Sequence, residues 1–225
     1  MGDWREFWRW GWTSCPGCGS FAIRPSLLCR PCEDFLLGKA RAAFAIEGHL
    51  GTRGLFHWNP GESDLLSNLL LALKGPGASK AWDFWSDIFL QVHGRAIGTM
   101  DEIALVAAPA RSHRRDHSIL FAEGLSERLG CENLGRVLLK DRSFHLRGLS
   151  RVEREGQKPF VKVTGWSAPA HRKFVFVDDI ITTGATARAV QQELMFPEGF
   201  EAWALALRTR QSCGASSPML GQSLF

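Results

Sequence analysis

The sequence has no apolar run that approaches about 18 residues, so it contains no transmembrane helix. Its first ten residues, MGDWREFWRW, mix charges with aromatics and lack the apolar stretch of a signal peptide. Internal repeats and low-complexity tracts are also absent. Hydrophobic residues make up 45% of the chain and charged residues 22%, which is close to the globular average and speaks against disorder or a fibrous class. We therefore expect a globular protein of the cytoplasm.

The excess of positive over negative charge is small, and cysteine is scarce. Lys plus Arg exceed Asp plus Glu by 27 to 23, and this net charge of +4 is too small to establish nucleic-acid binding. Six cysteines in 225 residues are too few for a disulfide scaffold, and four of them form one tight cluster. A metal-held cluster in a reducing compartment fits this usage better than an oxidised framework.

Tyrosine is absent, whereas the chain has nine Trp and fifteen Phe. Four of the Trp, at positions 4, 8, 10 and 12, fall in the first dozen residues. Aromatic side chains at this density are expected to pack onto the rest of the protein, or to stack on a partner such as the bases of single-stranded DNA. Both readings stay open.

Hydrophobic periodicity predicts helices in the first half of the chain and alternating strands and helices in the second. The predicted helices cover residues 34–48, 63–74, 79–93, 116–129 and 185–194, and the turn-rich segment 51–61 is expected to contain a short hairpin. The predicted strands cover residues 103–108, 134–139, 174–178 and 202–207, with a long loop over 140–170. This alternation predicts an α/β fold in which a mostly parallel sheet is flanked by helices.

The length of 225 residues leaves room for one ordinary domain and a small appendage. Residues 1–48 are assigned to the aromatic amino terminus, the cysteine cluster and a linking helix. Residues 49–210 form the α/β domain, and residues 211–225 form a tail that has little to bury.

Two C-x2-C pairs, separated by ten residues, bring four thiols together. They comprise Cys15, Cys18, Cys29 and Cys32. Two such turns facing each other give the tetrahedral sulfur cage that Zn2+ prefers, and four filled positions leave none open for catalysis. We therefore expect a structural zinc ion; two redox pairs, an iron–sulfur cluster or plain buried thiols are the alternatives. Cys131 and Cys213 stand alone and are read as incidental thiols.

The segment 174–186, FVFVDDIITTGAT, combines an apolar strand, two carboxylates and a Thr/Gly-rich turn that opens a helix. Open α/β sheets bind ligands at the carboxyl ends of their strands. The turn offers backbone N–H groups, hydroxyls and a helix amino terminus, which suit a phosphate. The two acids would repel that phosphate, so they are expected to face ribose hydroxyls or the waters of Mg2+. The alternative is a strand that merely ends in an acidic turn.

These thirteen residues resemble the phosphoribosyl pyrophosphate (PRPP) motif of the type I phosphoribosyltransferases. The resemblance implies that Asp178 and Asp179 hold the ribose hydroxyls. It also implies that the turn holds the 5′-phosphate, through Thr182, Thr183, Gly184, Ala185 and Thr186. Family members that act on purines often carry a third acid at the position of Thr182, so the resemblance does not point to purine salvage.

The resemblance extends to one subgroup, the ComF-like proteins of natural competence and DNA uptake, and covers most of the chain. It is carried by the cysteine pairs and by the segments 70–77 (LLALKGPG), 106–109, 114–118 and 148–154. Leu146 replaces a Gln of the family, and an Asn usual after residue 154 is missing. The resemblance implies a type I phosphoribosyltransferase-like fold with an amino-terminal zinc ribbon. It implies a pyrophosphate loop with Ala108, Pro109 and Arg111, and a mobile hood within residues 140–170.

Basic residues gather in the two loops that this resemblance assigns to the ligand. They are Arg111, His113, Arg114 and Arg115 in the first, and Lys140, Arg142, Arg147, Arg151 and Arg154 in the second. PRPP carries two anionic groups and needs cations from several directions, although each of these residues taken alone can be a solvated surface charge. Reaction at the anomeric carbon would pass through an oxocarbenium-like state, with Mg2+ on the departing pyrophosphate. No arrangement of Ser, His and Asp or of Cys and His indicates a covalent nucleophile.

Two functions follow from this reading. The first is Mg2+-dependent transfer of a phosphoribosyl group to an unknown acceptor, with Asp178, Asp179 and Arg111 as the catalytic residues. The second is a non-catalytic module of DNA uptake or recombination that binds PRPP together with single-stranded DNA or a protein.

Overall fold

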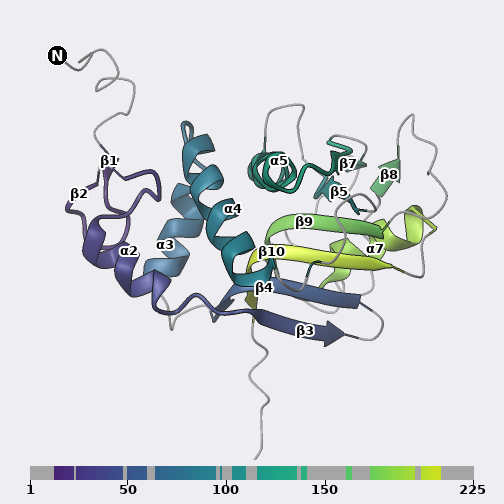
Figure 1. Cartoon of the computed structure of the whole chain (residues 1–225), viewed down its shortest axis with the longest axis horizontal. Helices are drawn as coiled ribbons and strands as arrows, with labels where there is room; N and C mark the ends of the chain where they lie inside the picture. The colour runs from purple at the N-terminus through teal and green to yellow at the C-terminus, as the bar shows by residue number, and fades with distance from the viewer. Residues whose placement is uncertain are drawn as a thin grey trace, which may run out of the picture.

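The structure is a computed structural model of the chain, shown in Figure 1. It describes residues 13–22, 24–47, 50–59, 64–94, 97, 103–109, 116–135, 138–140, 161–163, 173–195 and 199–208. The expectations for the amino-terminal Trp residues, for Arg111 and its basic loop, for most of the hood segment and for the tail lie outside these residues.

A six-stranded sheet forms the centre of the α/β part, in the order β3-β4-β10-β9-β5-β6. Its strands are β3 (Ala43–Glu47), β4 (Leu50–Trp58), β5 (Ile103–Ala107), β6 (Glu132–Asn133), β9 (Lys173–Ile181) and β10 (Phe200–Arg208). The five neighbouring strands β4, β10, β9, β5 and β6 run parallel, and β3 pairs antiparallel with β4 at the edge of the sheet. The predicted α/β class with a mostly parallel sheet is therefore confirmed.

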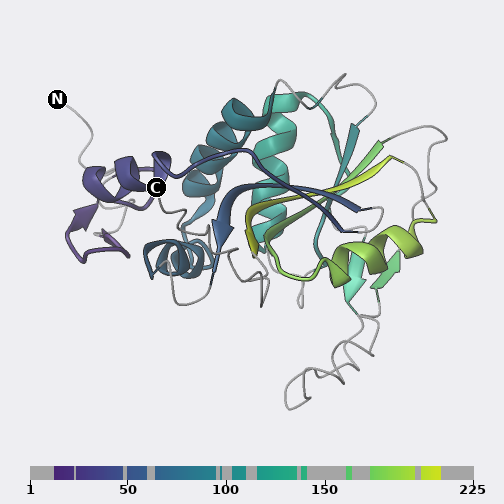
Figure 2. The same cartoon turned by 90° about the horizontal axis from the view of Figure 1, so that it is seen from below.

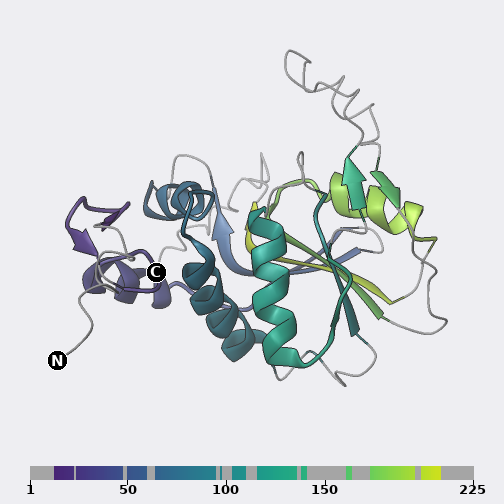
Figure 3. The ribbon, with the colours of Figure 1, turned by 90° about the horizontal axis from the view of Figure 1, so that it is seen from above.

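Helices cover both faces of this sheet. They are α3 (Asp64–Ala72), α4 (Ser79–His93), α5 (His117–Leu129) and α7 (Ala185–Glu193). Alternating residues of β9 point to opposite faces: Val175 and Val177 join the core under α3, α4 and α5, whereas Phe174 and Phe176 join the core under α7. Figures 2 and 3 show α4 and α5 on one side of the sheet and α7 on the other.

Local sequence signals explain several helix ends. The carboxylate of Asp116 accepts a hydrogen bond of 2.7 Å from the backbone N–H of His117 and caps α5. The same helix ends at Gly130, whose φ of 64° lies in the left-handed region that favours glycine. The helices predicted over 63–74, 79–93, 116–129 and 185–194 are all present within two residues.

Three of the predicted elements are wrong in type or in place. The helix expected over 34–48 is instead α2 (Arg30–Leu37) followed by strand β3, because the chain turns after Gly38 and the segment pairs with β4. The segment 51–61 is not a self-contained hairpin but lies mostly in β4, which is one continuous strand parallel to β10. In both places long-range strand pairing overrides the local pattern.

The strand expected over 134–139 is the third difference. Strand β6 ends just before that segment and joins the main sheet. Leu138 and Leu139, at the end of the segment, belong instead to a separate short strand, β7 (Leu138–Lys140), which pairs antiparallel with β8 (Val161–Val163). A β-strand thus interrupts the expected long loop over 140–170. Strand β8 lies against α7.

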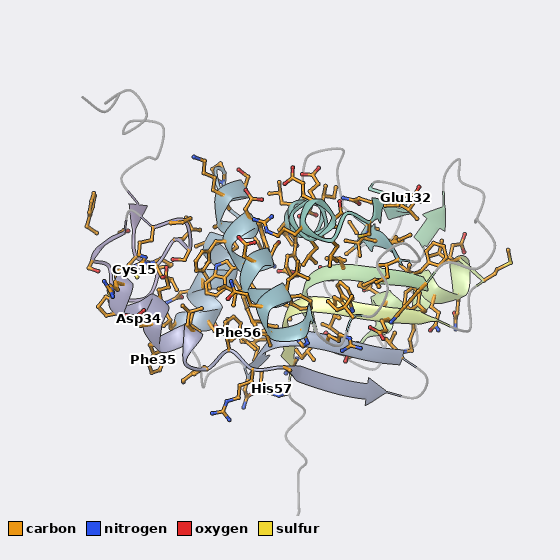
Figure 4. The ribbon with its side chains drawn as sticks, in the orientation of Figure 1. Cys15, Asp34, Phe35, Phe56, His57 and Glu132 are labelled. Atoms are coloured by element: carbon orange, nitrogen blue, oxygen red, sulfur yellow. The ribbon has the colours of Figure 1, made fainter. Side chains whose placement is uncertain are left out.

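The amino-terminal cysteines belong to a small unit that we call the Cys module, made of β1 (Thr13–Ser14), β2 (Phe21–Ala22) and α2. Its Leu28 and Leu36 belong to the same hydrophobic core as Trp85 of α4. The indole N–H of Trp85 also donates a hydrogen bond of 3.3 Å to the carbonyl of Ser26. Figure 4 shows Cys15 within this unit, at one end of the molecule. The module therefore packs onto the helical layer of the α/β part.

An ion cluster joins three strands near their amino-terminal ends. Glu201 of β10 accepts hydrogen bonds from Arg53 of β4 at 2.9 Å and from Lys173 of β9 at 2.8 Å. These cations outweigh the effect of burial and lower the pKa of Glu201 to about 2. Among the helices of the described ranges, none has both the length and the apolar character needed to cross a bilayer.

Candidate functional site

Strand β9 carries both predicted acids beyond the end of its neighbour β5. Pairing between the two strands reaches Val177, whose carbonyl accepts a hydrogen bond of 2.8 Å from the N–H of Ala108. Strand β9 then continues through Asp178 and Asp179 to Ile181, supported by β10 on its other side. The expectation that the strand ends at Asp178 is therefore wrong. Because β5 stops first, the edge of β9 at the two acids is open to groups from other elements.

Asp179 is the buried member of the pair, with a side chain that is 7% exposed. The ammonium of Lys74, in the turn after α3, lies 2.7 Å from Oδ2 as an ion pair, without the alignment of a regular hydrogen bond. The Nε2 of His117 lies 3.3 Å from Oδ1. Burial alone would raise the pKa of Asp179, but these two cations outweigh it and hold the pKa below its ordinary range.

His117 is the first residue of α5 and lies between two carboxylates. Its Nδ1 contacts Asp116, the cap of the same helix, and its Nε2 faces Asp179. Burial by itself would lower the pKa of His117, but the hydrogen bonds to both carboxylates raise it to about 9. The imidazole is therefore protonated at neutral pH and donates on both sides.

The pKa of Asp178 is shifted in the opposite direction to that of Asp179. Burial and the negative charge of Asp179 raise its pKa well above the ordinary value. Its Oδ1 accepts a hydrogen bond of 2.8 Å from the backbone N–H of Asp179. The pKa values of the two neighbouring carboxylates are thus pushed in opposite directions.

These groups also have the spacing of a cation site. One ligand atom each from His117, Asp178 and Asp179 lies within 4.8 Å of the others.

The Thr/Gly-rich turn follows directly after β9 and leads into α7. Gly184 is the amino-terminal cap of α7 and has a φ of 66°, a conformation that favours glycine. The hydroxyl of Thr183 accepts a hydrogen bond of 3.3 Å from the N–H of Ala185. Thr182 and Ala185 are exposed, and Thr183 and Thr186 are partly exposed. The first N–H groups of a helix have no partner within it, so this turn can receive an anion.

Arg188, one turn into α7, reaches back over the same segment. Its guanidinium donates a hydrogen bond of 2.5 Å to the carbonyl of Thr183. A methyl group on Gly184 would lie 3.1 Å from that guanidinium and 3.2 Å from Leu50. The turn is therefore closely packed on its inner side.

The structure brings together most of the residues that the sequence singled out. Asp178, Asp179 and the turn over 182–186 are consecutive at one sheet edge, and Ala108 and Pro109 follow the adjacent strand β5. Arg111 lies outside the described residues. Lys74, Asp116 and His117 were not assigned site roles from the sequence, although each stands in a segment that carries the family resemblance. No sequence spacing links position 74 to position 179, and only the fold brings them into contact.

The four cysteines of the Cys module converge as predicted. Their sulfur atoms all lie within 4.8 Å of one another, with Cys18 and Cys29 at 3.5 Å. Backbone hydrogen bonds from Cys15 N to the Ser20 carbonyl and from Gly19 N to the Cys15 carbonyl, of 2.6 and 2.8 Å, close the first turn. Cys29 caps α2, and Cys32 lies in its first turn. These four residues could bind a metal ion such as zinc.

The electrostatics of the thiols fit a divalent cation. Hydrogen bonding to Ser20 lowers the pKa of Cys18 to about 6, whereas burial and the neighbouring sulfurs raise the pKa of Cys32 above its ordinary value. Four thiolates this close repel one another, and a bound cation relieves that repulsion. A methyl group on Gly17 would lie 2.2 Å from Leu65 Cδ1 and 3.1 Å from Cys32 Sγ, so the turn also fits tightly against α3.

Comparison with models of known protein families and with curated protein sequences finds no match to this chain. The assignment of function therefore depends on the geometry of the two sites.

Proposed function

We propose that the chain is a ComF-like protein with a type I phosphoribosyltransferase-like fold, and that it binds PRPP with Mg2+ and transfers the phosphoribosyl group to an acceptor. The observation that carries this proposal is the run of β9, Asp178, Asp179 and the turn into α7 at the carboxyl edge of a parallel sheet. Ligands of open α/β sheets bind at that edge. A role in natural competence and DNA uptake follows from the sequence resemblance.

Each group of residues in the site can be assigned to one part of such a ligand. Asp179, held ionised, accepts hydrogen bonds from ribose hydroxyls, and Asp178 completes the hydroxyl site. The turn over Thr182, Thr183, Gly184, Ala185 and Thr186 receives the 5′-phosphate. Ala108, Pro109 and Arg111 face the pyrophosphate, on which Mg2+ supplies positive charge as the bond to the ribose breaks.

Binding is tested by calorimetry and by thermal unfolding of the full chain with PRPP and Mg2+. A hundredfold excess over the dissociation constant should stabilise the fold by about 2.7 kcal/mol. Asp179→Asn should abolish most of this stabilisation, because the amide is a weaker acceptor and leaves Lys74 without its counter-charge. Asp34→Asn is the matched control, since Asp34 is an exposed aspartate of α2. The absence of both heat and stabilisation in the wild-type protein would refute the proposal.

Transfer is tested separately, by release of pyrophosphate in a screen of nitrogenous acceptors. If PRPP binds and no acceptor releases pyrophosphate, the protein is the non-catalytic PRPP-binding module.

We further propose that Cys15, Cys18, Cys29 and Cys32 hold one structural zinc ion. The donor set supports this, because four sulfur ligands fill a tetrahedral site. Elemental analysis should find about one zinc per chain, and Cys18→Ser should lower that content. Iron in place of zinc would show that the site holds an iron–sulfur cluster.

One observation favours the second candidate, a surface for single-stranded DNA. Phe21 and Phe35 of the Cys module are 49% and 55% exposed, and the ammonium of Lys39 lies 4.3 Å from the centre of the Phe35 ring. Figure 4 shows Phe35 at the outer margin of the molecule. Exposed rings beside cations are the features on which bases stack. Fluorescence anisotropy should show binding of single-stranded DNA that is weaker in Phe35→Ala and falls steeply with salt concentration. An affinity that neither the substitution nor salt changes would exclude this surface.

A further inference from the structure

Asp179 is held by two cations that differ in how firmly they are fixed. His117 is locked at the start of α5, because its backbone N–H donates to Asp116 at 2.7 Å and its Nδ1 contacts the same carboxylate. Its side chain is 21% exposed. Lys74 stands in the turn after α3 with a side chain that is 41% exposed. A long, half-exposed side chain can change its partner, whereas the imidazole cannot turn away without losing its contact with Asp116.

The surroundings of the two partners support this difference. The side chain of Lys74 is 41% exposed, so it can leave Asp179 and reach another anion. Oδ2 of Asp179 is buried, however, and another donor must replace Lys74 there when it leaves. A ribose hydroxyl that approaches Asp179 would therefore take the place of Lys74 and leave His117 where it is.

The fold also determines which part of a ligand Lys74 can meet. Residues of α3 belong to the core that α4 and α5 share, on the sheet face opposite α7. The turn for the 5′-phosphate leads into α7. An anionic group beside Lys74 is therefore a second one, separate from the 5′-phosphate.

We propose that Lys74 is a binding residue for the pyrophosphate of the ligand, released from Asp179 when the ribose hydroxyl arrives, and that His117 is the positioning residue that stays on Asp179. This inference rests on the proposed PRPP site and deepens it. It makes the site selective for pentoses that carry a diol and two separated anionic groups.

The experiment measures the affinity of the full chain by calorimetry, with PRPP and with inorganic pyrophosphate, each with Mg2+. Lys74→Met should weaken both ligands about tenfold or more, because a charge-assisted contact is lost. His117→Gln should weaken PRPP and leave pyrophosphate within about twofold, because its effect passes through Asp179. Arg30→Met, a change at an exposed arginine of α2, should alter neither affinity, and Lys74→Arg should restore part of both.

The outcomes separate the two proposals. If wild-type protein binds no PRPP, both fall. If it binds PRPP but Lys74→Met leaves pyrophosphate binding unchanged, the role of Lys74 is refuted while the PRPP site stands. Should pyrophosphate alone bind too weakly to measure, ribose 5-phosphate, which lacks the pyrophosphate, is the comparison ligand. Lys74→Met should then weaken PRPP about tenfold and leave ribose 5-phosphate within about twofold, whereas equal losses for the two ligands would overturn direct contact.

Discussion

At the scale of single residues, the site depends on a difference between the electrostatic environments of two neighbouring carboxylates. Asp179 faces His117 and Lys74, whereas Asp178 is partly buried and lies next to the charge of Asp179. Strand geometry alone does not produce this difference between the two carboxylates. It arises because α5 and the turn after α3 each bring one cation to the open edge of β9.

The first prediction concerns the pH dependence that His117 confers on stability. Folding raises its pKa from an ordinary 6.5 to about 9, so its contribution is full below pH 6.5 and disappears as the pH rises through 9. Wild-type protein should therefore exceed His117→Gln in free energy of unfolding at pH 6, on the order of 2 kcal/mol, and the difference should shrink by pH 10. Urea unfolding at both pH values measures it. Parallel pH profiles for the two proteins would contradict the prediction, since all other titrating groups are shared.

At the scale of elements, the turn between β9 and α7 combines a conformational and a functional demand. Gly184 has nearly the same positive φ as Gly130, which ends α5: 66° and 64°. A methyl group at Gly130 would meet open space, whereas at Gly184 it would touch Arg188 and Leu50. The two glycines thus form a matched pair for separating backbone strain from the role of the turn.

The second prediction compares Gly184→Ala with Gly130→Ala. Each should destabilise the fold by about 1–2 kcal/mol, because alanine is strained at positive φ. Only Gly184→Ala should weaken PRPP binding, because it disturbs the backbone that we propose receives the 5′-phosphate. Thermal unfolding and calorimetry on both variants measure these effects. Equal PRPP affinities would show that the turn does not contact the ligand.

The third prediction concerns the contact between the Cys module and α3. Gly17→Ala should destabilise the protein by about 1–3 kcal/mol and loosen metal binding, because the new methyl group overlaps Leu65 and crowds Cys32. Adding Leu65→Ala should recover part of the metal retention by making room. Zinc release to a chromophoric chelator follows both variants. If Gly17→Ala releases zinc at the wild-type rate, the packing against Leu65 does not support the metal site.

At the scale of the whole molecule, the sequence predicted the elements better than their pairing. The local sequence pattern is sufficient to recognise the strand at Val175–Val177 and the helix over 79–93. It is also sufficient for the Cys pairs and the acids of β9. Strand β3 could not be found this way, because AFAIE resembles the end of an amphipathic helix until it meets β4. Lys74 and His117 were missed as site residues for the same reason: their roles come from contacts with a strand far along the chain.

The Cys module and the α/β part share one hydrophobic core. Cys15, Leu28 and Leu36 are each at most 2% exposed, and they belong to the same buried cluster as Trp85 and Leu66. A unit held only by a flexible linker would show no such continuity. The metal site should therefore support the stability of the whole chain, beyond that of the module itself.

The last prediction follows from this shared core. Removing the metal with a chelator should unfold the Cys module, expose the apolar faces of α3 and α4 that it covers, and lower the melting temperature of the entire protein. A loss of about 2 kcal/mol would shift the melting temperature of a chain of this size by roughly 4–8 °C. Circular dichroism and metal content, followed together, measure the effect. Trp85→Phe should weaken the coupling by about 1–3 kcal/mol, because it loses the hydrogen bond to the Ser26 carbonyl and leaves a cavity beside Phe56 and Phe84. If the metal-free protein melts at the temperature of the metal-bound form, the module is an independent appendage, and its core contacts contribute nothing to the stability of the sheet.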